Sequence, residues 1–138
     1  MIYHHLYISE KTPLYKEETD LERILESSRK NNDQKNITGL LIKNGAFFIQ
    51  VLEGKREDVL TTFNRISPDP RHMKVKTLLT YNDSVRIFPE WSMGIVDNDK
   101  HKVSIDKLVP LLHVDVIKLK SSKEKIIMLL KNFAKAPL

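Results

Sequence analysis

The stretch ITGLLIKNGAFFIQVL, residues 37–52, decides how the rest of the chain can be arranged. Two apolar runs flank the dipeptide Asn44-Gly45, and such a dipeptide supplies positive φ at both centres of a type I′ turn. That turn is a tight connection between antiparallel strands. We therefore predict a β-hairpin whose strands cover residues 37–43 and 46–52.

One polar residue stands inside this hairpin. Gln50 lies among aromatic and β-branched residues, and alternation puts it on the same side of its strand as Phe48 and Leu52. A buried amide must pair two donors and a carbonyl oxygen or lose about 1–3 kcal/mol. We expect this side of the strand to face helices and a specific group to meet Gln50, although backbone or water would also satisfy the amide.

The elements around the hairpin follow from periodicity and from start and stop signals. Thr19 and Glu22 form a capping box that starts a helix ending near Asn31 and Asn32. Gly54 opens a second helix, which the sequence PDP at 68–70 stops. Aromatic and β-branched runs predict three further strands, over residues 2–8, 75–81 and 91–96.

The predicted order is β-α-β-β-α-β-β, which is the α+β, ferredoxin-like plan with one extra strand and two helices on one face. We expect this unit to cover residues 1–97. Residues 98–138 form a separate extension, with helices predicted over 105–113 and 123–134.

Composition limits the classes of function. The chain has 138 residues, 41% hydrophobic and 30% charged, as expected for one globular domain. It has no cysteine, which excludes thiol chemistry. We see no signal peptide, no membrane span, no metal cluster and no phosphate-binding glycine motif, so we expect a cytoplasmic protein without a metal. The net charge of +5 is spread along the chain.

Candidate binding residues gather around Gln50. The first strand lies beside the third in a ferredoxin-like sheet, which makes a pair between Tyr7 and Gln50 reasonable. Side chains at the ends of the two helices would surround the gap between them, with Ile24 and Ile66 as apolar walls. These side chains are Asn31, Asn32, Arg65, Asp69, Arg71 and His72. These candidates also have ordinary structural explanations. Tyr7 could be a core aromatic, the two asparagines could be helix caps, and the charged residues with His72 could form surface ion pairs.

Five motifs in order resemble one known family, the blue-light-using-flavin (BLUF) photoreceptor domain. They cover roughly the first 95 residues, on the scale of one domain. The motifs are YIS at 7–9, ILESSRKNN at 24–32 followed by ITGLL, GAFFIQVLEG at 45–54, RISPDPRH at 65–72 and WSM at 91–93.

The resemblance implies a flavin, FAD in most members, with FMN or riboflavin as other forms that the same residues would hold. It implies that Asn32 and Gln50 bind the polar edge of the ring. It also implies contacts from Asp69 and Arg71, with Asn31, Arg65 and His72 as weaker candidates. The remaining predicted contacts are Tyr7, Ile24, Phe48, Leu52 and Ile66.

The resemblance further implies a photoreceptor that is not an enzyme. Light drives an electron and a proton from Tyr7, and Gln50 emerges with a changed tautomer or orientation. Trp91 and Met93, expected in the fifth strand, sense that change. The signal then passes to a separate effector protein, and a homo-oligomer is expected by analogy.

Two departures from the family pattern are visible. Asn36 stands where glycine is common, and asparagine also tolerates left-handed φ. His5 stands where an apolar residue is common, and we expect it to tune Tyr7.

An RNA-recognition module is the main alternative, because it shares the strand and helix order and stacks bases on aromatic side chains. The sequence KNGAFFIQV lacks the aromatic spacing of that module, however, and Gln50 and Leu52 interrupt the stacking surface. Nucleic acid is therefore the less favoured partner.

Overall fold

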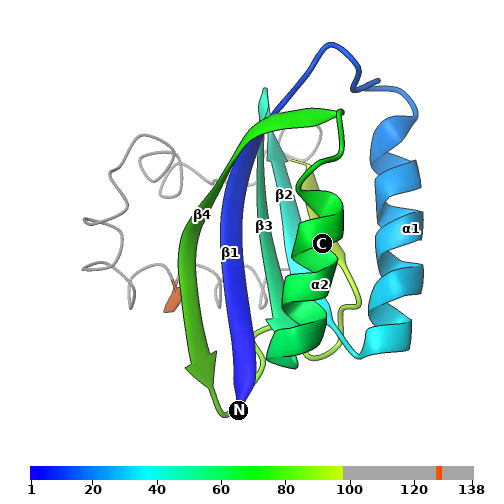
Figure 1. Cartoon of the computed structure of the whole chain (residues 1–138). Helices are drawn as coiled ribbons and strands as arrows, with labels where there is room; N and C mark the ends of the chain where they lie inside the picture. Colours follow the sequence, from blue (N-terminus) through cyan, green and yellow to red (C-terminus); the bar gives the residue numbers. More distant parts are fainter. Residues whose placement is uncertain (98–126, 129–138) are drawn as a thin grey trace.

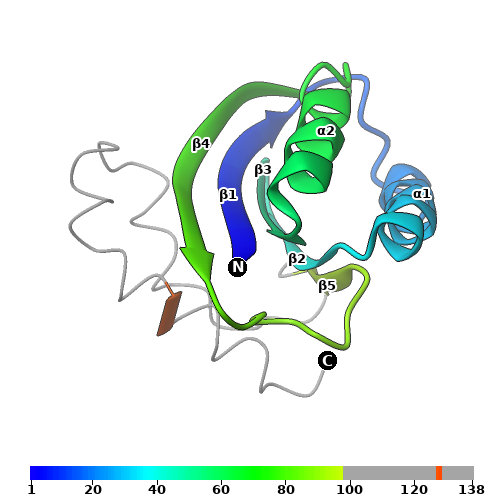
Figure 2. The same cartoon turned by 60° about the horizontal axis from the view of Figure 1, so that its bottom comes forward.

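The computed structural model describes residues 1–97, 127 and 128. Its elements are β1 (Ile2–Lys11), α1 (Asp20–Lys35), β2 (Thr38–Asn44), β3 (Phe47–Gly54), α2 (Arg56–Ile66), β4 (His72–Asp83) and β5 (Gly94–Asp97). This is the predicted ferredoxin-like order with the extra strand. Both helices lie on the same side of the sheet, which curves around α2 (Figures 1 and 2).

The five strands are arranged in the order β4-β1-β3-β2-β5. All neighbours are antiparallel except β2 and β5, which are parallel. β1 and β3 are adjacent in the middle of the sheet, as predicted, and their register places Tyr7 directly opposite Gln50. The fold itself therefore brings together the two residues that the sequence singled out.

The hairpin turn lies one residue later than predicted. Asn44 pairs with Phe47, so the two loop residues are Gly45 and Ala46. Gly45 has φ +57°, while neither Asn44 nor Ala46 has positive φ. Positive φ at the first loop residue alone is typical of a type II′ turn, so the type I′ prediction is wrong. The pairing moves by two residues as a result, and an even shift leaves every side chain on its predicted face.

The sheet is buried on both faces. The inner face packs against the helices through Leu25 of α1 and Val59 of α2, together with Phe48 and Leu52 of β3. The outer face carries a second cluster of apolar side chains from four strands and the segment after β4. Its members include Leu6, Ile8, Leu40, Ile42, Ile49, Val51, Leu79, Tyr81 and Phe88. Gln50 is therefore on the inner face, beneath the helices, as its alternation predicted.

Two predicted helix boundaries are wrong. α1 continues past Asn31 and Asn32 to Lys35, because Asn36 takes the left-handed conformation at φ 54° and ends the helix there. That part of the expectation for Asn36 is confirmed. Thr19 is at the N-cap but makes no side-chain cap hydrogen bond, so the capping box does not form. α2 begins at Arg56 and not at Gly54, which ends β3.

The last two strands also differ from the prediction. β4 begins at His72, so this residue belongs to a strand and not to the end of a helix. β5 begins at Gly94, and Trp91 and Met93 therefore precede the strand in which we expected them. The predicted helices at 105–113 and 123–134 lie outside the described residues, except for Ile127 and Met128, which are helical. Within the described residues, no helix has the length and hydropathy to cross a membrane.

Candidate functional site

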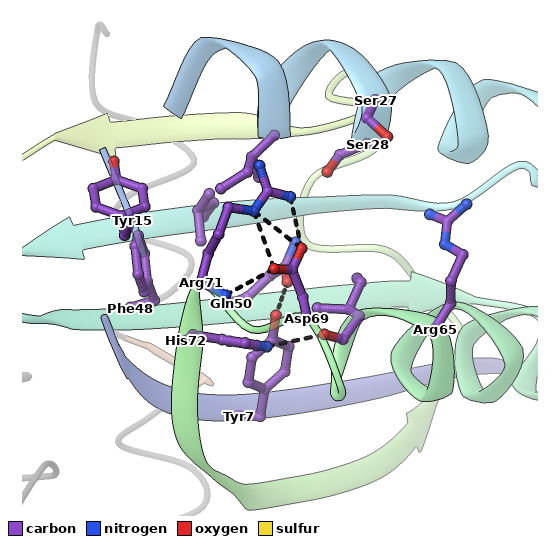
Figure 3. Close-up of a pocket in the computed structure, with 13 residues that line it drawn as sticks. Tyr7, Tyr15, Ser27, Ser28, Phe48, Gln50, Arg65, Asp69, Arg71 and His72 are labelled. Atoms are coloured by element: carbon purple, nitrogen blue, oxygen red, sulfur yellow. Dashed lines mark hydrogen bonds and ion pairs between the residues drawn. The ribbon is translucent and has the colours of Figure 1, made fainter. Parts of the chain in front are cut away.

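A cleft opens between the two helices and the inner face of the sheet (Figure 3). It encloses about 880 Å³ of space, including its open mouth. Nine of the predicted site residues line it: Tyr7, Ile24, Phe48, Gln50, Arg65, Ile66, Asp69, Arg71 and His72. Ile24 comes from α1 and Ile66 from α2, so the cleft has an apolar side chain from each of the two helices.

At the floor of the cleft, the phenol of Tyr7 donates a hydrogen bond to Oε1 of Gln50. Both side chains are buried, at 2% and 3% exposure. Burial, assisted by the negative charge of Asp69, raises the pKa of the Tyr7 phenol, so this group keeps its proton. The amide of Gln50 therefore has the partner that its position required.

The amide nitrogen of Gln50 faces the sulfur atom of Met93. Gln50 Nε2 lies 3.5 Å from the Sδ atom of Met93, which is 2% exposed and belongs to the inner cluster. Trp91 packs instead against the outer cluster, with its ring stacked on Phe88 at 5.5 Å between centroids. Met93 is thus the neighbour of Gln50 on the inner face of the sheet, and Trp91 packs at the outer face.

An ion pair occupies the mouth of the cleft. Nη2 of Arg71 donates to Oδ2 of Asp69 at 2.6 Å, and Nε donates to Oδ1 at 3.0 Å. The hydrogen bonds from Arg71 hold the pKa of Asp69 below its usual value, and Asp69 in turn raises the pKa of Arg71. Both groups therefore stay charged, and Figure 3 shows them above Gln50.

His72 is held in place from two sides. Its Nδ1 lies 2.8 Å from the hydroxyl oxygen of Ser9, and its Nε2 donates to the carbonyl of Ile66 at 2.9 Å. His72 begins β4, and one of its nitrogens contacts β1 while the other bonds to the end of α2. These two contacts fix the ring at the side of the cleft.

The predicted residues that do not line the cleft are Asn31, Asn32 and Leu52. Asn32 is buried and donates to the carbonyl of Ser92 at 2.6 Å. Asn31 bridges the helices, since its amide donates to the hydroxyl of Thr62 and its carbonyl accepts from Arg65 at 3.1 Å. Leu52 is fully buried in the inner cluster.

Four lining residues were missed by the sequence analysis: Tyr15, Ser27, Ser28 and Leu41. Leu41 had a usable signal, because it pairs with Gln50 across the hairpin and so shares its face. Ser28 follows Ile24 by one helical turn, which also places it on the cleft side. Tyr15 lies in the loop after β1, where no periodicity indicates its direction.

His5 lies on the inner face beside Tyr7 but makes no hydrogen bond to it. Its Nε2 is 3.0 Å from the hydroxyl of Thr77, and its ring packs on Phe63 with centroids 4.2 Å apart. Burial lowers the pKa of His5 to about 4, so the ring is neutral at ordinary pH. Among residues 1–97, 127 and 128, no group of three potential metal ligands is close enough to hold an ion.

Fold and site together define an α+β ligand-binding domain. Its cleft combines apolar walls with amide, phenol, hydroxyl and guanidinium groups that come from the sheet, from both helices and from the segment before β4. A planar heterocycle with several carbonyl and ring-nitrogen acceptors fits this set of donors.

Comparison with known proteins identifies the family. Residues 2–94 match the family described as "BLUF: Sensors of blue-light using FAD". The chain belongs to this family. It is thus a blue-light sensor domain that uses FAD, which favours the photoreceptor interpretation over the RNA-recognition alternative.

Curated relatives are much longer than this chain. The photoactivated adenylate cyclase subunit beta of Euglena gracilis is 36% identical over 89 residues, which cover 63% of this chain and 10% of that protein. The blue light- and temperature-regulated antirepressor BluF of Escherichia coli strain K12 is 33% identical over 82 residues, covering 59% and 20%. The chain therefore spans a tenth to a fifth of the length of these relatives.

Solved structures of similar size also match. The dark-state structure of BlrB, a BLUF protein, superposes with a TM-score of 0.80 at 31% identity, covering 96% of this chain and 95% of that one. The photo-activated state of BlsA superposes with a TM-score of 0.79 at 26% identity, covering 99% and 97%.

Proposed function

We propose that this protein is a reversible light switch in which Tyr7 and Gln50 are the photoactive pair. The observation that carries the proposal is the buried hydrogen bond from the Tyr7 phenol to Gln50 Oε1, at the floor of a cleft with apolar walls and polar donors for a flavin. An electron donor and a reorientable amide are thus in direct contact.

The residues that would hold FAD fall into two groups. Ile24 and Ile66 supply apolar walls for the faces of the ring system. Gln50 and Arg71 supply donors for its carbonyl and nitrogen edge and for the ribityl hydroxyls, His72 lies at the side of the cleft as a further contact, and Asn32 is expected to join them from α1. The further contacts that we propose are Tyr7, Asn31, Phe48, Leu52, Arg65 and Asp69.

When bound, FAD supplies the absorption of blue light and an excited state that accepts an electron. Tyr7 would pass one electron to the excited flavin and its phenolic proton along the hydrogen bond to Gln50 Oε1, and it would regain both when the charges recombine. Gln50 accepts from Tyr7 through Oε1 and presents its Nε2 donor to Met93. A turned or tautomerised amide exchanges these roles without changing the net charge, so the hydrogen bonds differ before and after light.

The output then leaves through the neighbours of Gln50. Met93 contacts the amide directly, and Trp91 lies two residues away at the edge of the outer cluster. We infer that these two residues relay the change, that residues 1–97 form the sensor, and that residues 98–138 form an output extension. The expected recipient is a separate effector protein in the cytoplasm, contacted by a homo-oligomer of this chain.

The first test is the visible absorption spectrum of the purified protein, in darkness and after blue illumination. Flavin bands that shift to the red and relax back in darkness are expected. A protein that is colourless and fails to bind added FAD would refute the proposal.

Two variants then test the photoactive pair. Tyr7→Phe and Gln50→Leu should each retain flavin and lose the light-induced shift, because one lacks the donor and the other lacks the amide. The matched control is Tyr81→Phe, which removes a phenol from the outer face and should leave the shift intact. A full shift in Tyr7→Phe would exclude Tyr7 as the donor.

A further inference from the structure

A buried acidic side chain on β3 has no role in the photochemistry described above. Glu53 is 0% exposed and lies on the outer face of the sheet, three residues after Gln50. Its register partner on β1 is His4, and His4 Nε2 lies 3.1 Å from Glu53 Oε2. The His4 ring stacks on Tyr81, with centroids 4.3 Å apart and planes nearly parallel. A carboxylate in such a place needs several donors to offset its desolvation.

Two of those donors come from the segment that joins β4 to β5, residues 84–93, here called the connector, and the others come from β1 and β2. Glu53 Oε1 accepts from the Phe88 N–H at 2.6 Å and from the Thr38 hydroxyl at 2.8 Å. Oε2 accepts from the Ile87 N–H at 2.7 Å. Burial alone would raise the pKa of Glu53, but the hydrogen bonds from His4 and these groups hold it below its usual value. The carboxylate is therefore charged, and charge-assisted bonds to two successive N–H groups are strong.

Arg86, the residue before Ile87 and Phe88, is also held in place by hydrogen bonds. Arg86 donates to the Thr38 hydroxyl at 2.9 Å, to the Glu53 carbonyl at 3.1 Å and to the Asn36 carbonyl at 2.8 Å. Three consecutive connector residues, 86–88, are thus fastened to the end of β3 and the start of β2.

The second half of the connector leads to the photoactive amide. Phe88 stacks on Trp91, and its carbonyl accepts from the Trp91 N–H at 3.2 Å. The Trp91 carbonyl accepts from the Gly39 N–H at 3.0 Å. Two residues later, Met93 Sδ lies 3.5 Å from Gln50 Nε2. An unbroken series of contacts therefore joins Glu53 to Gln50 around the sheet.

We propose that Glu53 is a positioning residue of the light sensor: its carboxylate anchors residues 86–88, and this anchor holds Met93 against Gln50. The inference rests on the proposed rearrangement of Gln50. Glu53 does not line the cleft, so it acts on the amide through the connector. During illumination residues 86–88 stay fixed, and residues 91–97 are the part of the connector and β5 that moves.

Glu53→Gln tests the anchor in the full chain with FAD bound. An amide presents only one acceptor oxygen to the two N–H groups, so one of them loses its partner. Leu79→Ala is the matched control, since it destabilises the same outer cluster from β4 without touching the carboxylate. Thr38→Val is a milder variant that keeps the charge and removes the hydroxyl between Arg86 and Glu53, for use if Glu53→Gln does not fold.

Two quantities are measured: amide hydrogen exchange at Ile87 and Phe88, in darkness and in light, and the rate of dark recovery of the flavin spectrum. In the parent protein, light should speed exchange at 91–97 and leave 87 and 88 protected. Glu53→Gln should expose 87 and 88 even in darkness and slow recovery several-fold, because the arrangement with Met93 on Gln50 is less favoured. Thr38→Val should do the same to a smaller extent.

Unchanged protection at 87 and 88, or equal slowing in Leu79→Ala, would overturn the inference. A parent protein without a light-induced shift would instead refute the proposed function. The exchange of 87 and 88 in darkness does not depend on the photocycle, so the two failures are distinguishable.

Discussion

Replacement of the Tyr7 phenol separates the hydrogen-bond energy of the photoactive pair from its photochemistry. Tyr7→Phe keeps the ring, which packs on Phe63 at 5.2 Å between centroids, and removes only the donor to Gln50. Gln50 Oε1 then has no partner in a site where both side chains are almost fully buried. A buried acceptor without a donor costs about 1–3 kcal/mol. For a chain of this length, the melting temperature should fall by roughly 4 °C for each kcal/mol.

The double variant makes the prediction sharper. Gln50→Leu alone leaves the Tyr7 hydroxyl unpaired and should cost a similar amount. In Tyr7→Phe/Gln50→Leu both polar groups are absent, so the second replacement should lower the free energy of unfolding by little more. The double variant should therefore be more stable than the sum of the two losses predicts, by about 0.5–3 kcal/mol of coupling.

Urea denaturation at a fixed, saturating concentration of FAD provides the four free energies of unfolding, because bound cofactor would otherwise shift each midpoint by mass action. The same samples are illuminated to record the red shift, which should be lost in all three variants. Additive losses would refute the reasoning, since they would mean that the two side chains do not exchange a hydrogen bond in the folded protein.

Three further predictions concern neighbours of the site. Gly94→Ala places a Cβ 2.5 Å from Cε3 of Trp91, so the indole must move, and the emission of this single tryptophan should change wavelength; identical emission would contradict the packing. His5 has its pKa lowered to about 4 by burial, so the unfolded chain binds more protons below pH 6.5 and stability falls as the pH drops from about 6.5 toward 4. His5→Leu should flatten that dependence in urea denaturation, and an unchanged slope would assign it to other groups. Ile24→Trp should fill the cleft and give a folded, colourless protein by circular dichroism and absorption, whereas bound flavin would show that Ile24 is not a wall.

Much of the fold could be predicted because it depends on local patterns. The period of two along β3 grouped Gln50 with Phe48 and Leu52, and the three share the inner face although the turn moved from Asn44-Gly45 to Gly45-Ala46. The position of Asn36 in the left-handed region was also foreseeable from its side chain. The end of α1 was not, because Asn31 and Asn32 are equally able to end a helix, and contacts with α2 and the connector extend it to Lys35.

By itself, the sequence determined the order of the elements and which strand residues share a face with Gln50, because alternation and strand order are properties of short segments. It made a pair between Tyr7 and Gln50 reasonable, and the register of β1 and β3 in the folded sheet places them directly opposite each other. Only the tertiary structure decided that Met93 and not Trp91 meets the amide, and that Glu53 fastens the connector. These contacts join residues 43 and 35 positions apart, and they depend on how side chains fill the space between packed layers, which no local period records.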